Sequence, residues 1–276
     1  MIRPLPPPVP PQTGRVLIGV FDSGVGGLSV LRSLKAHLPG ANFLYLADSA
    51  HAPYGERSDE FIRERTLRVA THLLAQGATL LVLACNTATA MAAAAVRERW
   101  PQVPLVAVEP GIKPAVALSR NGRIGVMATP ATLRSDKFQR LSQAHGSTVL
   151  LHLQPCPGLA GLIEQVDAEP DALHALIDSF AAPLRDAAVD TVVLGCTHYP
   201  FVIEWIQASL GDGVTLIDTA DAVARQAVRL LGAQASAFQE GHGHVRLQTT
   251  GDTALLERFA QRWLPFRSEV GAAPGL

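Results

Sequence analysis

The sequence predicts an α/β fold built from two similar parallel-sheet domains, with a functional site in the cleft between them. Three observations point to this fold. Short apolar runs alternate with longer helical patterns, the pattern repeats once along the chain, and each copy carries a cysteine where a buried run ends. Buried strands that alternate with helices are typical of βαβ units and parallel sheet. Sites in such folds lie where strand ends meet helix starts.

The first observation places nine strands, with helical patterns between most of them. The strands are expected over residues 16–21, 42–47, 79–83, 105–108, 123–127, 148–153, 191–194, 214–217 and 245–249. Helices are expected over residues 58–76, 88–100, 171–188 and 220–231, among others. Residues 1–14 contain six prolines and predict a disordered leader, and residues 269–276 predict a flexible tail.

The second observation is an internal repeat at an offset of about 110 residues. Residues 18–20 recur as Ile-Gly-Val at 124–126, and residues 80–87 recur at 191–197 with a cysteine at the sixth position of each. A weaker match links 106–109 with 216–218. Matches in the same order at nearly one offset predict two related halves. Halves that face each other would enclose one cleft with pseudo-twofold symmetry.

Composition excludes several classes of function. The formal net charge is -1 and no block of Lys or Arg stands out, so we expect no nucleic-acid partner. No apolar run reaches the roughly 20 residues that span a bilayer, so we expect no membrane association. The chain has three lysines, none placed convincingly for a pyridoxal Schiff base. We therefore expect a cytoplasmic protein that uses no cofactor.

The third observation concerns the cysteines, of which there are three, Cys85, Cys156 and Cys196. Their wide spacing without Cys-x-x-Cys argues against a disulfide framework and against a metal site. Either Cys85 or Cys196 alone is explained equally well as a small buried hydrophobe. Equivalent positions in two halves favour a function, and the following helix starts are expected to lower both thiol pKa values. Cys156 has no counterpart in the repeat and is expected to be structural.

Two thiols on opposite walls of one cleft suit the inversion of an amino-acid α-carbon. A base removes the α-proton from one face, and an acid returns a proton to the other face. The carbanion-like transition state also needs fixed hydrogen-bond donors around the carboxylate. Asn86-Thr87 and Thr197-His198 follow the two cysteines and can supply such donors.

Three further segments are less specific when each is taken alone. Asp22-Ser23-Gly24-Val25-Gly26-Gly27 follows the first strand and can approach an anion, but it lacks the spacing of a dinucleotide fingerprint. The Asp22 carboxylate can accept a proton or orient a thiol. Pro53-Tyr54-Gly55 alone reads as an ordinary turn, and a helical Glu164 alone reads as a solvated side chain.

Together these segments resemble the glutamate racemase family over about residues 15–232. The matching blocks are 22–27, 53–57, 84–88 and 195–200. The resemblance implies interconversion of L- and D-glutamate without a cofactor, which supplies D-glutamate for peptidoglycan. It implies that Cys85 and Cys196 are the catalytic thiols, that Asp22 assists Cys85 and that His198 assists Cys196. Glu164 falls near a further acidic residue of the family's site.

The resemblance also implies a set of substrate contacts and a discontinuous first domain. The expected contacts are Asp22, Ser23, Pro53, Tyr54, Gly55, Asn86, Thr87, Thr129, Thr197 and His198. The first domain is expected to comprise residues 15–110 plus 221–268, and the second residues 111–220. The expected partner is the small-molecule substrate, and a homodimer is an open possibility.

Three alternatives remain open from the sequence. The first is a racemase of aspartate or another amino acid on the same fold, although aspartate racemases commonly carry Glu where His198 stands. The second is a cysteine hydrolase that uses Cys196 with His198. The third is a glutamate-binding protein with no chemistry at all.

Overall fold

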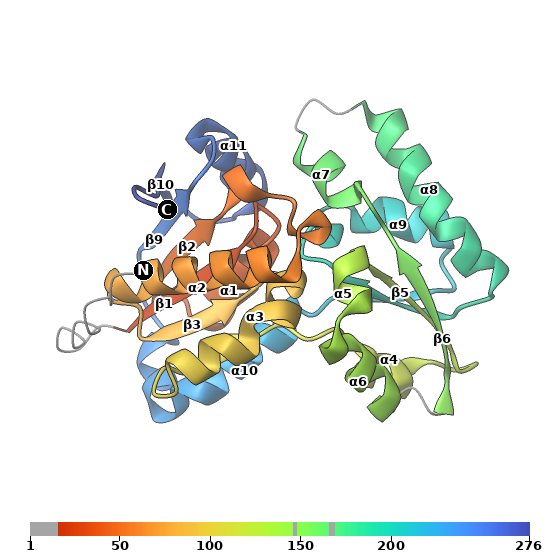
Figure 1. The fold of residues 1–276 in the computed structure, drawn as a ribbon, viewed down its shortest axis with the longest axis horizontal. Coiled ribbons are helices and arrows are strands. Elements are labelled where there is room, and N and C mark those ends of the chain that lie inside the picture. Colours follow the sequence, from red (N-terminus) through yellow and green to blue (C-terminus); the bar gives the residue numbers. More distant parts are fainter. Residues whose placement is uncertain (1–15, 146–147, 166–168) are drawn as a thin grey trace.

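The computed structural model describes residues 16–145, 148–165 and 169–276, and its strands form two separate parallel sheets (Figure 1). The leader expected over residues 1–14 lies outside the described residues. The strand order is β10-β9-β2-β1-β3-β4 in one sheet and β6-β5-β7-β8 in the other. We call the six-stranded sheet with its helices the first lobe and the four-stranded sheet with its helices the second lobe. The predicted fold class is confirmed.

All nine expected strands form, each with ends within two residues of the prediction. They are β1 (Leu17–Asp22), β2 (Asn42–Ala47), β3 (Leu80–Leu83), β4 (Leu105–Ala107), β5 (Arg123–Ala128), β6 (Leu150–Pro155), β7 (Thr191–Gly195), β8 (Thr215–Ile217) and β9 (Val245–Thr249). The interior strands carry continuous apolar runs because helices cover both faces of a parallel sheet.

Helices connect consecutive strands and cover the sheets. They are α1 (Leu28–His37), α2 (Asp59–Ala75), α3 (Asn86–Arg99), α4 (Ile112–Leu118), α5 (Pro130–Arg134), α6 (Asp136–His145), α7 (Leu159–Glu164), α8 (Pro170–Asp186), α9 (Ile203–Leu210), α10 (Ala220–Leu231) and α11 (Thr253–Trp263). In the first lobe α1 packs on α10 and α2 on α3, and in the second α8 packs on α9. None of the helices within the described ranges has both the length and the hydropathy of a bilayer-spanning segment.

The internal repeat is visible in the topology, since β2-β1-β3-β4 and β6-β5-β7-β8 follow the same order. The third residue of both β1 and β5 is a glycine, which also supports the internal repeat. A Cβ on Gly19 would lie 3.0 Å from Ala78 Cβ, and one on Gly125 would lie 3.0 Å from Val192 Cγ2. Because glycine has no side chain, Ala78 can pack closely against β1 and Val192 against β5.

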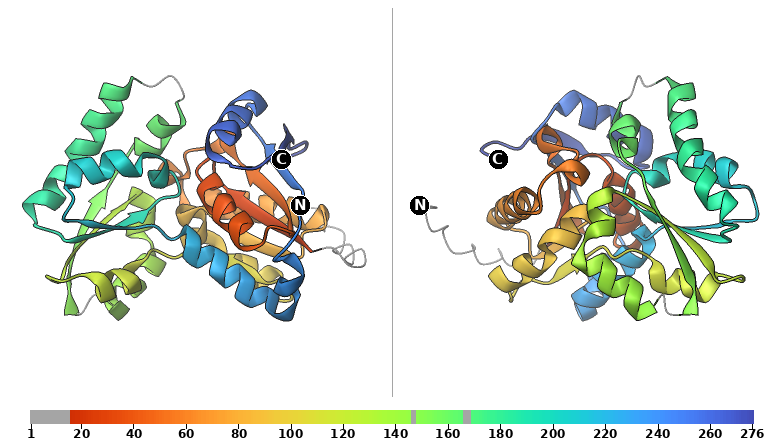
Figure 2. Two further views of the ribbon diagram at one scale, coloured as in Figure 1. Left: turned by 180° about the vertical axis from the view of Figure 1, so that it is seen from behind. Right: turned by 45° about the vertical axis from the view of Figure 1, so that its right-hand side comes forward.

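The C-terminal segment returns to the first lobe, where β9 pairs with β2. In Figures 1 and 2 this blue segment lies beside the red N-terminal strands. The flexible tail expected over residues 269–276 is wrong in its first part, because β10 (Glu269–Ala272) pairs in parallel with β9. This strand is short, carries Gly271 and Ala272 and lies at the sheet edge, so it lacks the apolar pattern of an interior strand.

We predict that Gly19→Ala lowers the free energy of unfolding by about 1–3 kcal/mol, because the new methyl group overpacks the contact between β1 and its neighbours. Gly271→Ala is the matched control, since a Cβ there meets no atom within 4 Å. Urea denaturation of both variants checks this. An equal effect in the two would contradict the packing argument.

Candidate active site

The carboxyl ends of strands from both lobes border one cavity of about 230 Å³. Cys85 follows β3 and Cys196 follows β7, which are equivalent strands of the two sheets. Both thiols line this cavity, and they are only 5% and 7% exposed. The topology thus brings together two cysteines that are 111 positions apart in the chain.

Nearly all of the expected site residues line this cavity with the two cysteines. They are Ser23, Pro53, Tyr54, Gly55, Asn86, Thr87, Thr129, Glu164, Thr197 and His198. Asp22 is the exception: it is fully buried behind the wall, and its carboxylate accepts a hydrogen bond from Thr197 Oγ1 at 3.0 Å. Cys156 also lines the wall, where its thiol donates to the Gln154 carbonyl at 3.4 Å.

The Cys85 thiol caps the start of α3. Its sulfur accepts a hydrogen bond from Ala88 N at 3.4 Å and donates to Ser23 Oγ at 3.5 Å. Burial raises the pKa of the Cys85 thiol to about 12, and the nearby Asp22 carboxylate adds to the rise. The expected lowering of this pKa is therefore wrong, because desolvation outweighs the helix start. Cys85 holds its proton at neutral pH.

Cys196 lies beside a different set of groups. His198 Nδ1 is 3.5 Å from Cys196 Sγ, and His198 Nε2 is 2.6 Å from Glu164 Oε1. Burial alone would lower the pKa of His198, but its hydrogen bonds to Cys196 and Glu164 raise it well above the usual value. Burial would raise the pKa of Glu164, but the bond to His198 lowers it. The largely buried pair is an imidazolium and a carboxylate, with side chains 6% and 17% exposed, and the imidazolium contacts the Cys196 sulfur.

The two lobes are hydrogen-bonded to each other around the thiols. Val25 N of the glycine turn donates to Glu164 Oε1 at 3.0 Å. Ser29 Oγ donates to the Thr197 carbonyl at 3.0 Å. A Cβ on Gly24 would collide with the Glu164 carboxylate. The glycine turn therefore lets the first lobe reach a catalytic candidate of the second.

One donor in the wall has no partner. The amide Nδ2 of Asn86 is buried and makes no hydrogen bond to any described residue. Its neighbour Thr87 is satisfied, since Thr87 Oγ1 lies 3.0 Å from Thr129 Oγ1 of the second lobe. Buried donors without a partner are rare in native proteins, which makes Asn86 a candidate donor to a ligand.

Two residues behind the wall, Asp48 and Arg65, were not predicted from the sequence. Asp48 follows β2 directly and is fully buried, and Arg65 of α2 forms an ion pair with it at 2.7 Å. A carboxylate at a strand's carboxyl end was the available signal, because Asp22 is the last residue of β1 and Asp48 directly follows β2. The partner on α2 gave no signal, since helical arginines are usually solvated.

The family model described as Asp/Glu/Hydantoin racemase matches residues 18–227, and the chain belongs to this family. It is accordingly an isomerase.

The chain is also similar to individual glutamate racemases. The chain is 55% identical over 218 residues to a glutamate racemase of Pseudomonas aeruginosa, covering 79% of this chain and 82% of that protein. It resembles the crystal structure of a glutamate racemase isoform of Bacillus anthracis with a TM-score of 0.86 and 31% identity, covering 94% and 98% of the two chains. An Escherichia coli glutamate racemase in complex with L-glutamate gives a TM-score of 0.79 at 32% identity, covering 95% and 100%. The resemblance stated from the sequence is confirmed.

The ion pair between His198 and Glu164 should make a pH-dependent contribution to stability. We expect His198→Gln to lower the free energy of unfolding by about 3 kcal/mol at neutral pH, because Glu164 is left buried without its cation. The raised pKa of His198 means that this contribution is lost as pH rises through that pKa. The lowered pKa of Glu164 means that it is lost as pH falls through that pKa. Urea denaturation across a pH series measures the difference between wild type and variant.

The exposed pair His37–Asp221, with side chains 33% and 55% exposed, is the matched control. His37→Gln should change stability far less, because water screens that pair. A pH-independent difference for His198→Gln would contradict the charged state assigned to the buried pair.

Proposed function

We propose that this protein interconverts L- and D-glutamate, without a cofactor, through proton transfer by Cys85 and Cys196. The observation that carries the proposal is the pair of buried thiols at equivalent strand ends of two lobes, lining one cavity. The relatives support glutamate as the substrate over aspartate, since the similar proteins are glutamate racemases and one is complexed with L-glutamate.

The chemistry follows from the unequal surroundings of the thiols. Cys85 is protonated and can act as the acid. The His198 imidazolium stabilises negative charge on the Cys196 sulfur, so Cys196 can act as the base. The Cys196 thiolate takes the α-proton and leaves its electron pair on the α-carbon, delocalised into the carboxylate. The Cys85 thiol then gives its proton to the opposite face, and the reverse reaction exchanges the two roles.

The carboxylate that receives this charge needs fixed donors. The unpartnered amide of Asn86, at the start of α3, can supply one of them beside Cys85. Such donors act strongly in a buried site because they need no reorganisation when charge develops. We infer that the D-glutamate formed serves peptidoglycan synthesis in the cytoplasm, whose reducing conditions keep all three cysteines as thiols.

Substrate identity is tested by exchange of the α-hydrogen in heavy water. L-glutamate should incorporate deuterium at the α-carbon and yield D-glutamate. L-aspartate should react at least about a hundredfold more slowly, because a shorter side chain leaves buried polar groups unpaired. Proton NMR and a chiral separation follow both processes. No exchange with glutamate would remove the substrate assignment.

The two-thiol mechanism is tested by Cys85→Ser and Cys196→Ser. Each should lower racemisation by about 10³-fold or more, because a serine hydroxyl is a poor acid and base at neutral pH. Each should retain α-hydrogen exchange for the one enantiomer whose hydrogen faces the remaining thiol.

Cys156→Ser is the matched control, since it changes a thiol that lines the same cavity. Its racemisation should fall less than about tenfold. A hydrolase using Cys196 and His198 would instead keep nearly full turnover in Cys85→Ser, and a mere binding protein would show no exchange in any variant.

A further inference from the structure

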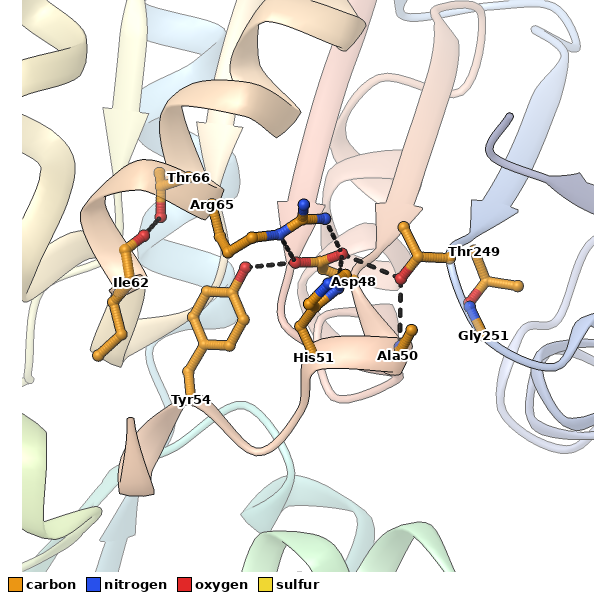
Figure 3. A network of polar contacts seen from close by, with 10 residues as sticks. Asp48, Ala50, His51, Tyr54, Ile62, Arg65, Thr66, Thr249 and Gly251 are labelled. Carbon is orange, nitrogen blue, oxygen red and sulfur yellow. Dashed lines mark hydrogen bonds and ion pairs between the residues drawn. The ribbon is translucent and has the colours of Figure 1, made fainter. Parts of the chain in front are cut away.

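Asp48 lies at the end of β2 and gathers hydrogen bonds from several elements (Figure 3). Its Oδ2 accepts from Tyr54 Oη at 2.6 Å and from Arg65 Nε at 2.9 Å. Its Oδ1 accepts from Arg65 Nη2 at 2.7 Å and from Thr250 Oγ1 at 2.9 Å, and His51 Nδ1 lies 3.0 Å away. The carboxylate is therefore saturated and has one fixed orientation.

The pair formed by Asp48 and Arg65 is ionised. Burial would raise the pKa of Asp48, but the hydrogen bonds from Arg65 and Tyr54 lower it below the usual value. The Asp48 side chain is 0% exposed and that of Arg65 is 6% exposed. The guanidinium donates a hydrogen bond to each carboxylate oxygen. A buried bidentate pair of this kind is rigid, and its net charge is zero.

Tyr54 connects this pair to the cavity. Its hydroxyl points to Asp48, as Figure 3 shows, and its ring packs between Phe21 and Phe61 with centroids 6.1 and 6.4 Å away. The tyrosine is 1% exposed, yet it forms part of the cavity wall. The hydroxyl thus faces away from a substrate and serves to hold the ring.

Gly55, the residue after Tyr54, links this part of the wall to the second lobe. A Cβ on Gly55 would lie 2.9 Å from Thr129 Cβ, so the backbone at Gly55 lies directly against Thr129. Thr129 Oγ1 in turn lies 3.0 Å from Thr87 Oγ1, beside Cys85. A displacement of Tyr54 and Gly55 would therefore disturb the wall that faces Cys85 and its contact with the second lobe.

We propose that Asp48 and Arg65 are positioning residues that set substrate affinity by fixing Tyr54 and Gly55 as the wall of the cavity. The inference rests on the proposed function, because it assigns the part of that site that shapes the substrate-binding wall. Neither residue lines the cavity, so both act through Tyr54 and the backbone that follows it.

The test separates KM from kcat in Asp48→Asn and Tyr54→Phe. Asn keeps the shape of Asp48, but its Nδ2 cannot accept the hydrogen bonds made to one carboxylate oxygen. We expect KM for glutamate to rise about tenfold, with kcat changed less than about threefold, because the hydrogen bonds of the two thiols go to other residues. Tyr54→Phe keeps the ring and removes only the bond to Asp48, so KM should rise several-fold even where Asp48→Asn fails to fold.

Asp190→Asn is the matched control for lost stability. Asp190 is buried just before β7, at the end of that strand away from Cys196, and accepts hydrogen bonds from Ser119 Oγ and from the backbone N–H groups of Arg120 and Asn121. This variant should lower Tm as Asp48→Asn does and leave KM unchanged.

The outcomes separate the two proposals. If wild type racemises glutamate and Tyr54→Phe keeps the wild-type KM, or if Asp190→Asn raises KM equally, the positioning role is wrong. If wild type does not racemise glutamate, the proposed function fails, and the positioning role fails with it.

Discussion

The site depends on one close approach, that of the glycine turn after β1 to the charged groups of the second lobe. Glu164 takes a hydrogen bond from the backbone at Val25, and a side chain at Gly24 would occupy the place of its carboxylate. The same turn begins with Asp22, which accepts a hydrogen bond from Thr197 Oγ1. The residues of this turn that contact the second lobe are therefore also among those that surround the thiols.

The contact has an electrostatic consequence. Asp22 is fully buried, Glu164 is largely buried, and both acids lie near one imidazolium, His198. Burial raises the pKa of Asp22, and the charge of Glu164 adds to the rise, while His198 opposes it. Glu164 is the acid paired directly with the imidazolium, and its pKa falls. Two acids that lie close together in a low dielectric raise each other's pKa, and the acid that is hydrogen-bonded to the imidazolium has the lowered pKa. The Asp48–Arg65 pair has no net charge, so it adds none to the charges of Asp22, Glu164 and His198.

Much of this arrangement could be predicted from the sequence, because periodicity and local repeats encode it. Nine strands and the pairing of Cys85 with Cys196 follow from apolar runs and from their recurrence. Strand β10 could not be predicted, because an edge strand containing Gly271 and Ala272 owes its structure to its neighbour β9. The raised pKa of Cys85 could not be predicted either, since desolvation depends on atoms brought from elsewhere in the chain.

The duplicated scaffold carries an unsymmetrical site, and thermodynamics limits what the asymmetry can do. Cys85 lies with Ser23 and near Asp22, whereas Cys196 lies with His198 and Glu164. Two enantiomers have equal free energies in water, so a racemase must have equal kcat/KM in both directions, however different its two thiols are. The difference between the thiols can appear only as compensating differences in kcat and KM. The imidazolium beside Cys196 and the raised pKa of Cys85 are the two features of the structure from which such a difference would arise.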